Sequence, residues 1–592
     1  MKNTLQGVSL THISLTLVGL MWVFPFLIYH HAYPVTTFYQ EWWSALLGVS
    51  ALILLTDRDY WRQPDIPRIA QLPAALIGVV VLQWSLDKIA YFDQALLFVL
   101  YLLFAMLLIL LGARLRDCFG ITRLAQVLAI FLLVGAELSA LVGVLQHFRW
   151  DTPLGAVVVM KISSSVYGNI AQPNHFANYI ALGMISLGFL LHQQKLRVVH
   201  VAVLAMPLLL VMALSGSRSS WLYLLMMAGL AWWLARHDAK QSLLLRYTLW
   251  LLAGFGAMHL IVQLPFTTGA QNSVNTVQRL FSEDVSGGGV RLFLWREAML
   301  MFMQSPWVGV GFGQFAWQHF QLLPELQPKG VHGLYNNAHS FVFQLAAETG
   351  IAGLLSLFLP LGVWFMGLRR SPLDAAHWWG YAVLGVLSIH SLLEYPLWYA
   401  YFMAIAAFLL GMLDETRYHL ELRRVGRLSV VLILFLGLLS LMQLMTGYRE
   451  LEQVQEIRSA SKIGENTAEL LHEKLVAVHT GSLLSPYAEL FMANLIEVND
   501  DHLKEKLAIN SRVMHFVPIS SVVYRQALLL AQADQLEQAK ITVLQAIWSF
   551  PGQFDHMHKQ LLLKAEKDPE HYAALLEFAL QKNQEYRSGI HR

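Results

Sequence analysis

Apolar residues in the first 450 positions form long, nearly unbroken stretches separated by short polar breaks. About thirteen such stretches are present, and a helix needs roughly 20 apolar residues to cross the core of a bilayer. They lie near 11–32, 41–56, 70–86, 93–112, 124–147, 176–191, 198–214, 220–235, 247–264, 340–367, 377–393, 397–413 and 428–447. The pattern predicts an all-α, polytopic integral membrane protein with about 12–13 transmembrane helices.

Another pattern begins after position 447, where amphipathic stretches are separated by prolines. These prolines are 32 and 33 residues apart, close to the tetratricopeptide period of roughly 34 residues. They are Pro486, Pro518 and Pro551. The segment 524–548 predicts two helices joined near Ala533-Asp534. We therefore expect a tetratricopeptide-like domain, with a helical domain that lacks true repeats as the alternative.

Composition agrees with this division. Hydrophobic residues make up 56% of the chain and charged residues only 14%, whereas soluble globular proteins carry about 25% charged residues. Charge is concentrated in the last 145 residues. We expect a transmembrane catalytic domain, 1–447, that contains a long loop, 265–339, and a soluble helical domain, 448–592.

Charge and cysteine content exclude several classes of protein. The net charge is +2 and no dense basic stripe occurs, so a nucleic-acid partner is not expected. Cys118 is the single cysteine, which excludes an internal disulfide and a cysteine-based zinc site.

Orientation follows from the positions of Lys and Arg, because short loops rich in these residues stay in the cytoplasm. With the N-terminus inside, 18 of them face the cytoplasm, mainly in 57–69, 113–123, 236–246 and 414–427. An odd number of spans then places the charged tail outside. If two neighbouring stretches were one span, the tail would lie in the cytoplasm.

Polar residues gather on the predicted outer side. Gln172-Pro173-Asn174-His175 leads into the sixth apolar stretch. Asn174 could cap the following helix, but capping explains one residue and leaves Gln172 and His175 unexplained. Their clustering favours a functional role.

Two arginines are also predicted to lie on this side. Arg218 stands in the short turn 215–220 among hydroxyl groups, where its planar guanidinium group suits phosphate binding. The alternative is an arginine that only extends its charged end to the membrane surface. In the long loop, a Gly287-Gly288-Gly289 break precedes an amphipathic stretch that places Arg291 and Trp295 one turn apart. A surface-lying helix is the alternative there.

The loop ends at His339, at the start of the tenth apolar stretch. A histidine at such an interface can accept a proton near pH 7, with a capping role as the alternative. In the turn 391–399, the carboxylate of Glu394 would cost free energy at this depth in the membrane unless it were paired. We therefore expect it to contact an arginine or a tyrosine hydroxyl. Two arginines, a histidine, amides and aromatic rings suit a lipid substrate that carries phosphate. No motif for a cofactor or metal occurs.

These residues together resemble the O-antigen ligase and polymerase superfamily. The motifs that carry the resemblance are Gln172-Pro173-Asn174-His175, Ser217-Arg218-Ser219, Arg291-x-x-x-Trp295, Pro306 with Gly309-x-Gly311-x-Gly313, and His339 with Glu348-x-Gly350. Segment 391–399 and the helical tail are most similar to its protein-glycosylating branch, the bacterial pilin O-oligosaccharyltransferases. Ser340 follows His339 where the superfamily often has asparagine, while Asn336 and Asn337 precede it. The orienting partner of the histidine is therefore open.

The resemblance implies transfer of a glycan, en bloc, from an undecaprenyl-pyrophosphate carrier to Ser or Thr of a periplasmic acceptor protein such as a pilin. The enzyme would lie in the bacterial inner membrane, with its active site facing the periplasm, and use no metal or cofactor. By match to the family, Arg218 and Arg291 bind the pyrophosphate and His339 activates the acceptor. The expected substrate-binding residues are Gln172, Asn174, His175, Trp295, Glu394 and Tyr395.

Other functions fit parts of the sequence. A ligase or polymerase acting on lipopolysaccharide glycans would share the membrane core, although it has little use for a soluble helical tail. A lipid or solute transporter would also explain many spans, but transporters usually place ionisable residues near the midplane of the membrane. A membrane scaffold would leave the clustering of Arg and His unexplained.

Overall fold

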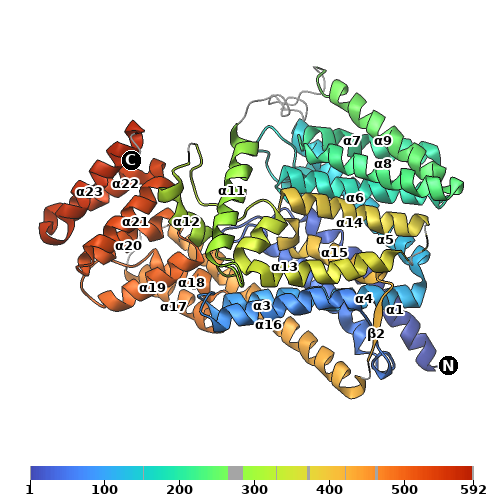
Figure 1. Cartoon of the computed structure of the whole chain (residues 1–592), viewed down its shortest axis with the longest axis horizontal. Coiled ribbons are helices and arrows are strands. Elements are labelled where there is room, and N and C mark those ends of the chain that lie inside the picture. Colours follow the sequence, from blue (N-terminus) through green and yellow to red (C-terminus); the bar gives the residue numbers. More distant parts are fainter. Residues whose placement is uncertain are drawn as a thin grey trace. The chain divides into compact units, whose positions relative to one another are not determined.

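The computed structural model describes residues 2–150, 152–264, 285–328, 330–369, 372, 374–420, 422–460 and 465–589. The first part of the predicted long loop, 265–284, lies outside the described residues. The helices before the tail are α1 (Lys2–Met21), α2 (Phe38–Ala51), α3 (Gln71–Ser85), α4 (Phe92–Phe119), α5 (Ile121–Phe148), α6 (Pro173–His192), α7 (Val198–Leu214), α8 (Ser219–His237), α9 (Ser242–Ile261), α11 (Val285–Gln304), α12 (Phe315–Leu326), α13 (Phe341–Leu368), α14 (Ala375–Leu393), α15 (Ala400–Leu413) and α16 (Arg423–Ala460) (Figure 1). Two short antiparallel strands, β1 (Asp65–Pro67) and β2 (Arg417–His419), pair with Ile66 opposite Tyr418.

Each of the thirteen predicted stretches coincides with a helix. Among the described residues, nine helices are long and apolar enough to cross a membrane, and α7 and α15 are shorter apolar helices. The prediction of an all-α, polytopic membrane protein is confirmed. Helices form here because lipid offers the backbone no hydrogen-bond partners. Only 11% of the apolar window of α16 is buried within the protein, as expected of a helix that faces lipid.

The chain divides into two compact units, named here the first unit and the second unit. The first unit comprises Met1–Ala75, Tyr101–Asp284 and Ser356–Leu441. Its central helix is α6, since 89% of the apolar window of α6 is buried. A Cβ added to Gly183 of α6 would lie 2.2 Å from the Cβ of Ala136 on α5. A small residue thus lets these helices approach closely.

The second unit comprises Leu76–Leu100, Val285–Leu355 and Met442–Arg592. Its tail helices are α17 (Glu465–Gly481), α18 (Ser485–Ala493), α19 (Leu503–Phe516), α20 (Ser520–Gln532), α21 (Leu536–Ser549), α22 (Phe554–Lys567) and α23 (Pro569–Ser588). Each of the three evenly spaced prolines stands at the start of a helix pair: α18 with α19, α20 with α21, and α22 with α23. The turn predicted near Asp534 is also present, with Asp534 in the left-handed region at φ 58°.

Helix α12 contributes to the hydrophobic core of the tail. Phe320 is fully buried there, and Trp317 and Leu334 pack against the same cluster. Helix α12 contacts α19 and α21. The sequence predicted that the long loop belongs to the domain 1–447. In the structure, the described part of this loop belongs to the same compact unit as the tail.

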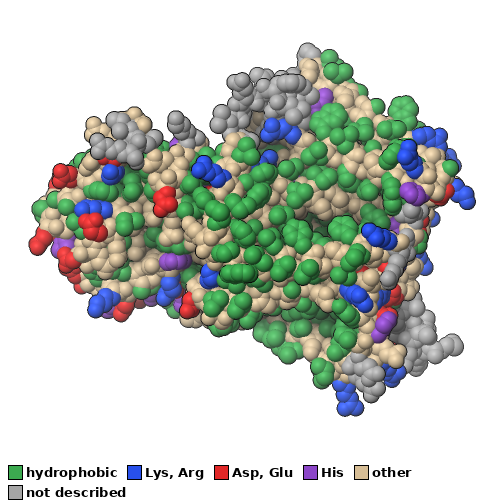
Figure 2. Space-filling view, viewed as in Figure 1, with side chains coloured by type: hydrophobic (Ala, Val, Ile, Leu, Met, Phe, Trp, Pro, Cys, Tyr) green, Lys and Arg blue, Asp and Glu red, His purple; other side chains and the backbone are tan. Residues whose placement is uncertain are grey.

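The two kinds of surface differ as the composition predicts. Figure 2 shows charged side chains scattered over the tail helices and a mostly hydrophobic surface over the membrane helices. On α16, for example, Leu432, Phe435 and Met442 are 57%, 64% and 66% exposed. Such large apolar side chains lie at a surface when lipid rather than water covers them.

Candidate active site

The first turn of α6 is held by a side chain that the sequence analysis did not assign to capping. Gln172 is the N-cap residue, and its Oε1 accepts a hydrogen bond of 2.5 Å from the backbone N–H of His175. Pro173 follows at the first helical position, where its fixed φ is favourable. The alternative that Asn174 caps this helix is therefore wrong, because Gln172 is the N-cap residue.

The amide of Asn174 contacts the end of α14. Asn174 Nδ2 donates to Glu394 Oε1 at 2.7 Å, and Glu394 is only 2% exposed. An arginine or a tyrosine hydroxyl was predicted as the partner of Glu394, whereas this hydrogen bond comes from an amide. Burial raises the pKa of the adjacent Tyr395, and the charge of Glu394 raises this pKa further. The ring of His175 lies edge-on to Tyr395, with 5.8 Å between the centroids.

The structure thus brings five predicted site residues together in the first unit, and we call this group the α6 cluster. It consists of Gln172, Asn174, His175, Glu394 and Tyr395. Amide, carboxylate, imidazole and phenol groups are combined here at the ends of two helices. This combination can orient a polar substrate through several hydrogen bonds.

Arg218 stands at the start of α8 in the same unit, and it is exposed. The preceding turn is fixed by Ser215, whose Oγ accepts from the N–H of Ser217 at 3.2 Å. The hydroxyls of Ser217 and Ser220 are buried and form no hydrogen bond within the described structure. A guanidinium, two buried hydroxyl groups and the positive end of a helix dipole make this turn suitable for an anion.

A second group of predicted residues lies on α11 and at the start of α13. Helix α11 begins at Val285, so it includes the three glycines 287–289 and the predicted glycine break is wrong. Trp295 stacks on Phe343 of α13, with 5.1 Å between the rings and 17° between their planes. The stack joins the helix of the partly buried Arg291 to the segment that follows His339.

His339 occupies a tight turn, in the left-handed region at φ 50°. Its backbone N–H donates to Asn337 Oδ1 at 2.8 Å, and the N–H of Ala338 donates to Gln344 Oε1 at 2.7 Å. Side chains on both sides of the histidine therefore hold its backbone in place. Asn337, which precedes His339, is the residue that fixes this backbone in the absence of an asparagine at position 340.

The glycine motif has a structural role. The N–H of Val310 donates to the carbonyl of Ala347, and the N–H of Gly311 donates to the carbonyl of Glu348, each at 3.0 Å. The accepting carbonyls lie in α13 just before Gly350, whose φ of 61° interrupts the helical geometry. A Cβ on Gly309 would lie 2.2 Å from the carbonyl of Glu348. The motif therefore docks one loop onto the kink of α13.

Gln83 is an important residue that the sequence analysis missed. It is fully buried, donates to the carbonyls of Val308 (2.5 Å) and Glu348 (2.7 Å), and accepts from the N–H of Phe312 at 3.0 Å. Its signal in the sequence is a polar amide near the end of an apolar stretch, which usually has a specific partner. Lys88 adds a bond to the carbonyl of Gly309 at 2.9 Å.

A buried ion pair was missed as well. His319 Nδ1 lies 2.8 Å from Glu297 Oε2, His319 Nε2 lies 3.2 Å from the carbonyl of Gly333, and both side chains of the pair are 0% exposed. The pair ties α11 to α12.

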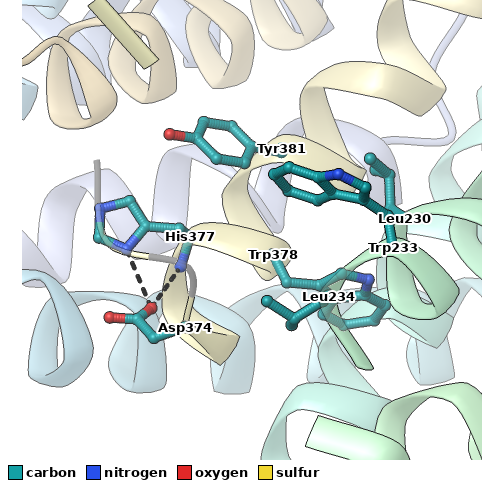
Figure 3. A pocket seen from close by; sticks show the side chains of 7 residues that line it. All are labelled: Leu230, Trp233, Leu234, Asp374, His377, Trp378 and Tyr381. Atoms are coloured by element: carbon teal, nitrogen blue, oxygen red, sulfur yellow. Dashed lines mark hydrogen bonds and ion pairs between the residues drawn. The ribbon is translucent and has the colours of Figure 1, made fainter. Parts of the chain in front are cut away.

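Two cavities in the first unit contain none of the predicted site residues. One holds about 10 Å³, hardly a single water, and is lined by Leu230, Trp233, Leu234, Asp374, His377, Trp378 and Tyr381 (Figure 3). His377, which bonds to Asp374, lies 13 residues before His390 on α14, roughly 20 Å along the helix. The other, about 590 Å³, lies between residues 363–367 and 415–419 with Arg68. Among the described residues no group of His, Cys, Asp and Glu could hold a metal.

Comparisons with known proteins agree with the motifs. Family models match at residues 166–191 (protein glycosylation ligase), 201–359 (O-antigen ligase) and 378–580 (virulence factor membrane-bound polymerase, C-terminal). These matches support assignment of the chain to the O-antigen ligase superfamily. Within this superfamily, a general O-oligosaccharyltransferase of Acinetobacter baylyi is 27% identical over 72% of this chain and 74% of its own length. A ComP-specific O-oligosaccharyltransferase of the same organism is 23% identical over 68% and 71%.

The O-antigen ligase match and the two oligosaccharyltransferase relatives identify this chain as a glycosyltransferase, which is not compatible with the transporter alternative. The O-antigen ligase match contains Arg218, Arg291 and His339, and the short glycosylation-ligase match contains Gln172. The third match runs from α14 through most of the tail. The predicted site residues and the tail thus all lie in segments that resemble known members.

Proposed function

We propose that the protein is an O-oligosaccharyltransferase that moves a glycan en bloc from an undecaprenyl-pyrophosphate carrier to Ser or Thr of a periplasmic protein such as a pilin. The observation that carries this proposal is the anion-suited turn at Arg218, which lies in the same unit as the α6 cluster. The names of the two relatives support a protein acceptor. The tail supports it too, because a ligase for lipid-bound sugars has little use for such a domain.

The chemistry needs few groups. The acceptor oxygen forms a bond to the anomeric carbon while the bond from this carbon to the pyrophosphate oxygen breaks, and its electron pair stays on the pyrophosphate. As the sugar gains oxocarbenium character, negative charge grows on the leaving group. Arg218 and Arg291 would hold that charge through planar, bidentate contacts. The hydroxyl proton must pass to a base.

His339 is the best candidate for this base. Imidazole is the side chain most often used as a general base, and the backbone of His339 is fixed by Asn337. His339 is partly exposed, whereas His175 is 1% exposed, with its Nδ1 2.7 Å from His390 Nε2. A hydroxyl that arrives from water therefore meets His339 more easily. The α6 cluster would orient the substrates, and Trp295 would support Arg291.

The acceptor protein is proposed to bind the tail, α17–α23, because none of the predicted site residues lies on these helices. We place the enzyme in the bacterial inner membrane with this chemistry on the periplasmic side. The distribution of Lys and Arg supports that orientation.

The test uses the full chain, purified and supplied with a lipid-linked oligosaccharide. One reaction contains a candidate pilin and another contains the lipid A core, the acceptor of a lipopolysaccharide ligase. Transfer to the pilin is expected, and it should fall at least tenfold in the variants Arg218→Lys and Arg291→Lys, which keep the charge but lose the bidentate fork. Arg296→Lys, on the exposed side of α11, is the matched control and should stay active.

Two outcomes would contradict the proposal. Transfer only to the lipid A core would identify the lipopolysaccharide ligase, the alternative that the O-antigen ligase match favours. Full activity in both lysine variants would reduce the arginines to general positive charge and remove the main support for pyrophosphate binding.

A further inference from the structure

Three buried side chains form a chain of hydrogen bonds that starts at His175 of the α6 cluster. His175 Nδ1 lies 2.7 Å from His390 Nε2, and His390 Nδ1 lies 2.9 Å from the hydroxyl oxygen of Tyr223. These side chains are 1%, 0% and 0% exposed. They come from α6, α14 and α8, which pack against one another in the first unit (Figure 1). The chain therefore connects three helices at one place.

Each of these helices carries residues of the proposed site close to its member of the chain. Gln172 and Asn174 lie at the first turn of α6, and Arg218 stands at the start of α8. Glu394 and Tyr395 follow directly after α14. A small shift of any one of the three helices would therefore move part of the site relative to the rest.

The chemistry of the three groups suits this place. A phenol and two neutral imidazoles can each donate and accept, so both hydrogen bonds of the chain can form without any charge. An ion would be costly in these apolar surroundings. Hydrogen bonds weaken steeply when they are bent, so the chain fixes ring orientation more sharply than apolar contacts do. The His175 ring is also held edge-on by Tyr399 at 5.1 Å and Phe402 at 5.6 Å.

We propose that His390 and Tyr223 are positioning residues for glycan transfer. Through the ring of His175 they hold the first turns of α6 and α8 in the arrangement that the transition state requires. The inference rests on the proposed function, and it adds two residues that no motif identified. Neither residue needs to touch a substrate.

The sharpest test removes one hydroxyl group. Tyr223→Phe keeps the buried ring and deletes only the bond to His390. Tyr179→Phe is the matched control, because Tyr179 is a fully buried tyrosine on α6 whose hydroxyl donates to the carbonyl of Trp22 at 2.7 Å. Both variants lose one buried hydrogen bond, so a general loss of stability affects them alike.

We expect Tyr223→Phe to lower the kcat of transfer about tenfold or more, because hydrogen-bond partners that orient the ligands of metal enzymes contribute roughly 10- to 100-fold, and Tyr223 orients His390 in the same manner. The KM for the lipid-linked donor should change by less than about twofold, since charge attraction tolerates small shifts better than transition-state alignment does. Tyr179→Phe should keep the kcat of the natural protein. A merely structural role would lower both variants together.

A second pair of variants tests His390. His390→Gln retains a group able to hydrogen-bond to His175 and should keep more activity than His390→Leu, which fills the space without polar atoms. Equal activity in these two variants, or natural kcat in Tyr223→Phe, would overturn the inference. The natural protein is the reference for both tests. If it transferred no glycan, the proposed function would fail, and this result is distinct from a failure of the positioning role.

Discussion

Gly309 offers a direct test of how the loop 306–313 holds α13. Its φ is +71°, and a Cβ would lie 2.2 Å from the carbonyl carbon and oxygen of Glu348 and 2.3 Å from the N of Thr349. All of these are backbone atoms, so no side chain can rotate away. In Gly309→Ala, the left-handed backbone costs about 1–2 kcal/mol and the overlap about 1–3 kcal/mol, together about 2–5 kcal/mol.

Gly330→Ala separates the two contributions. Gly330 has a similar φ of +76°, but nothing lies within 4 Å of the added Cβ. This variant should therefore show the backbone cost alone, about 1–2 kcal/mol. Thermal unfolding of both purified variants in the same detergent gives the comparison, with a clearly lower unfolding temperature expected for Gly309→Ala.

Glycan transfer is the second measurement. Displacing the loop disturbs the hydrogen bonds to α13, and α13 begins two residues after His339. A shift of about 1 Å in a catalytic group can cost roughly 10²-fold in rate, so Gly309→Ala should lose most of its activity. If Gly309→Ala were as stable and as active as Gly330→Ala, the glycine would not be needed for this contact and the structural account of the motif would be wrong.

Three further predictions concern the base, the tail and the orientation. His339→Ala should lose at least about 10² in transfer rate while donor binding remains, and near-natural activity in a correctly inserted protein would exclude His339 as the base. Burial raises the pKa of Glu489, but hydrogen bonds led by Arg512 outweigh it and hold this pKa below 4.5. A lowered pKa stabilises the fold above the unfolded pKa, and this stabilisation is lost as pH falls through the folded value. At pH 7 the natural protein should therefore have a higher unfolding temperature than Glu489→Gln. This difference in unfolding temperature should disappear when the pH falls below about 4. A difference that does not depend on pH would contradict the pairing of Glu489 with Arg512. Reporter fusions after residues 427 and 448 should give opposite signals, whereas identical signals would place the tail in the cytoplasm.

The positions of the membrane helices could be predicted because each apolar stretch is a local property of the sequence. That Arg291 and Trp295 lie one helical turn apart was predictable for the same reason, since both belong to one helix. The partners of these residues were not. Phe343 is one of many aromatic residues in the chain, and only the packing of α13 on α11 selects it for Trp295.

The N-terminus of α6 shows a similar limit. Asn174 is a better N-cap residue than Gln172 by general preference. In the structure Gln172 takes the N-cap position, and the amide of Asn174 donates to the carboxylate of Glu394, 220 positions away. A preference measured on local sequence cannot include such a contact. His390 and Tyr223 escaped notice because histidine and tyrosine are ordinary residues at the ends of membrane helices.

The burial of Phe320 within the core of the tail has a consequence for engineering. A chimera that receives only residues 448–592 from a relative would place a foreign tail around the natural α12, and Phe320 and Trp317 would face a core that did not coevolve with them. Grafts that aim to change the acceptor should therefore transfer α12 together with the tail. Deletion of the tail would uncover these same rings, so a truncated protein reports on the integrity of the His339 loop as well as on acceptor recognition.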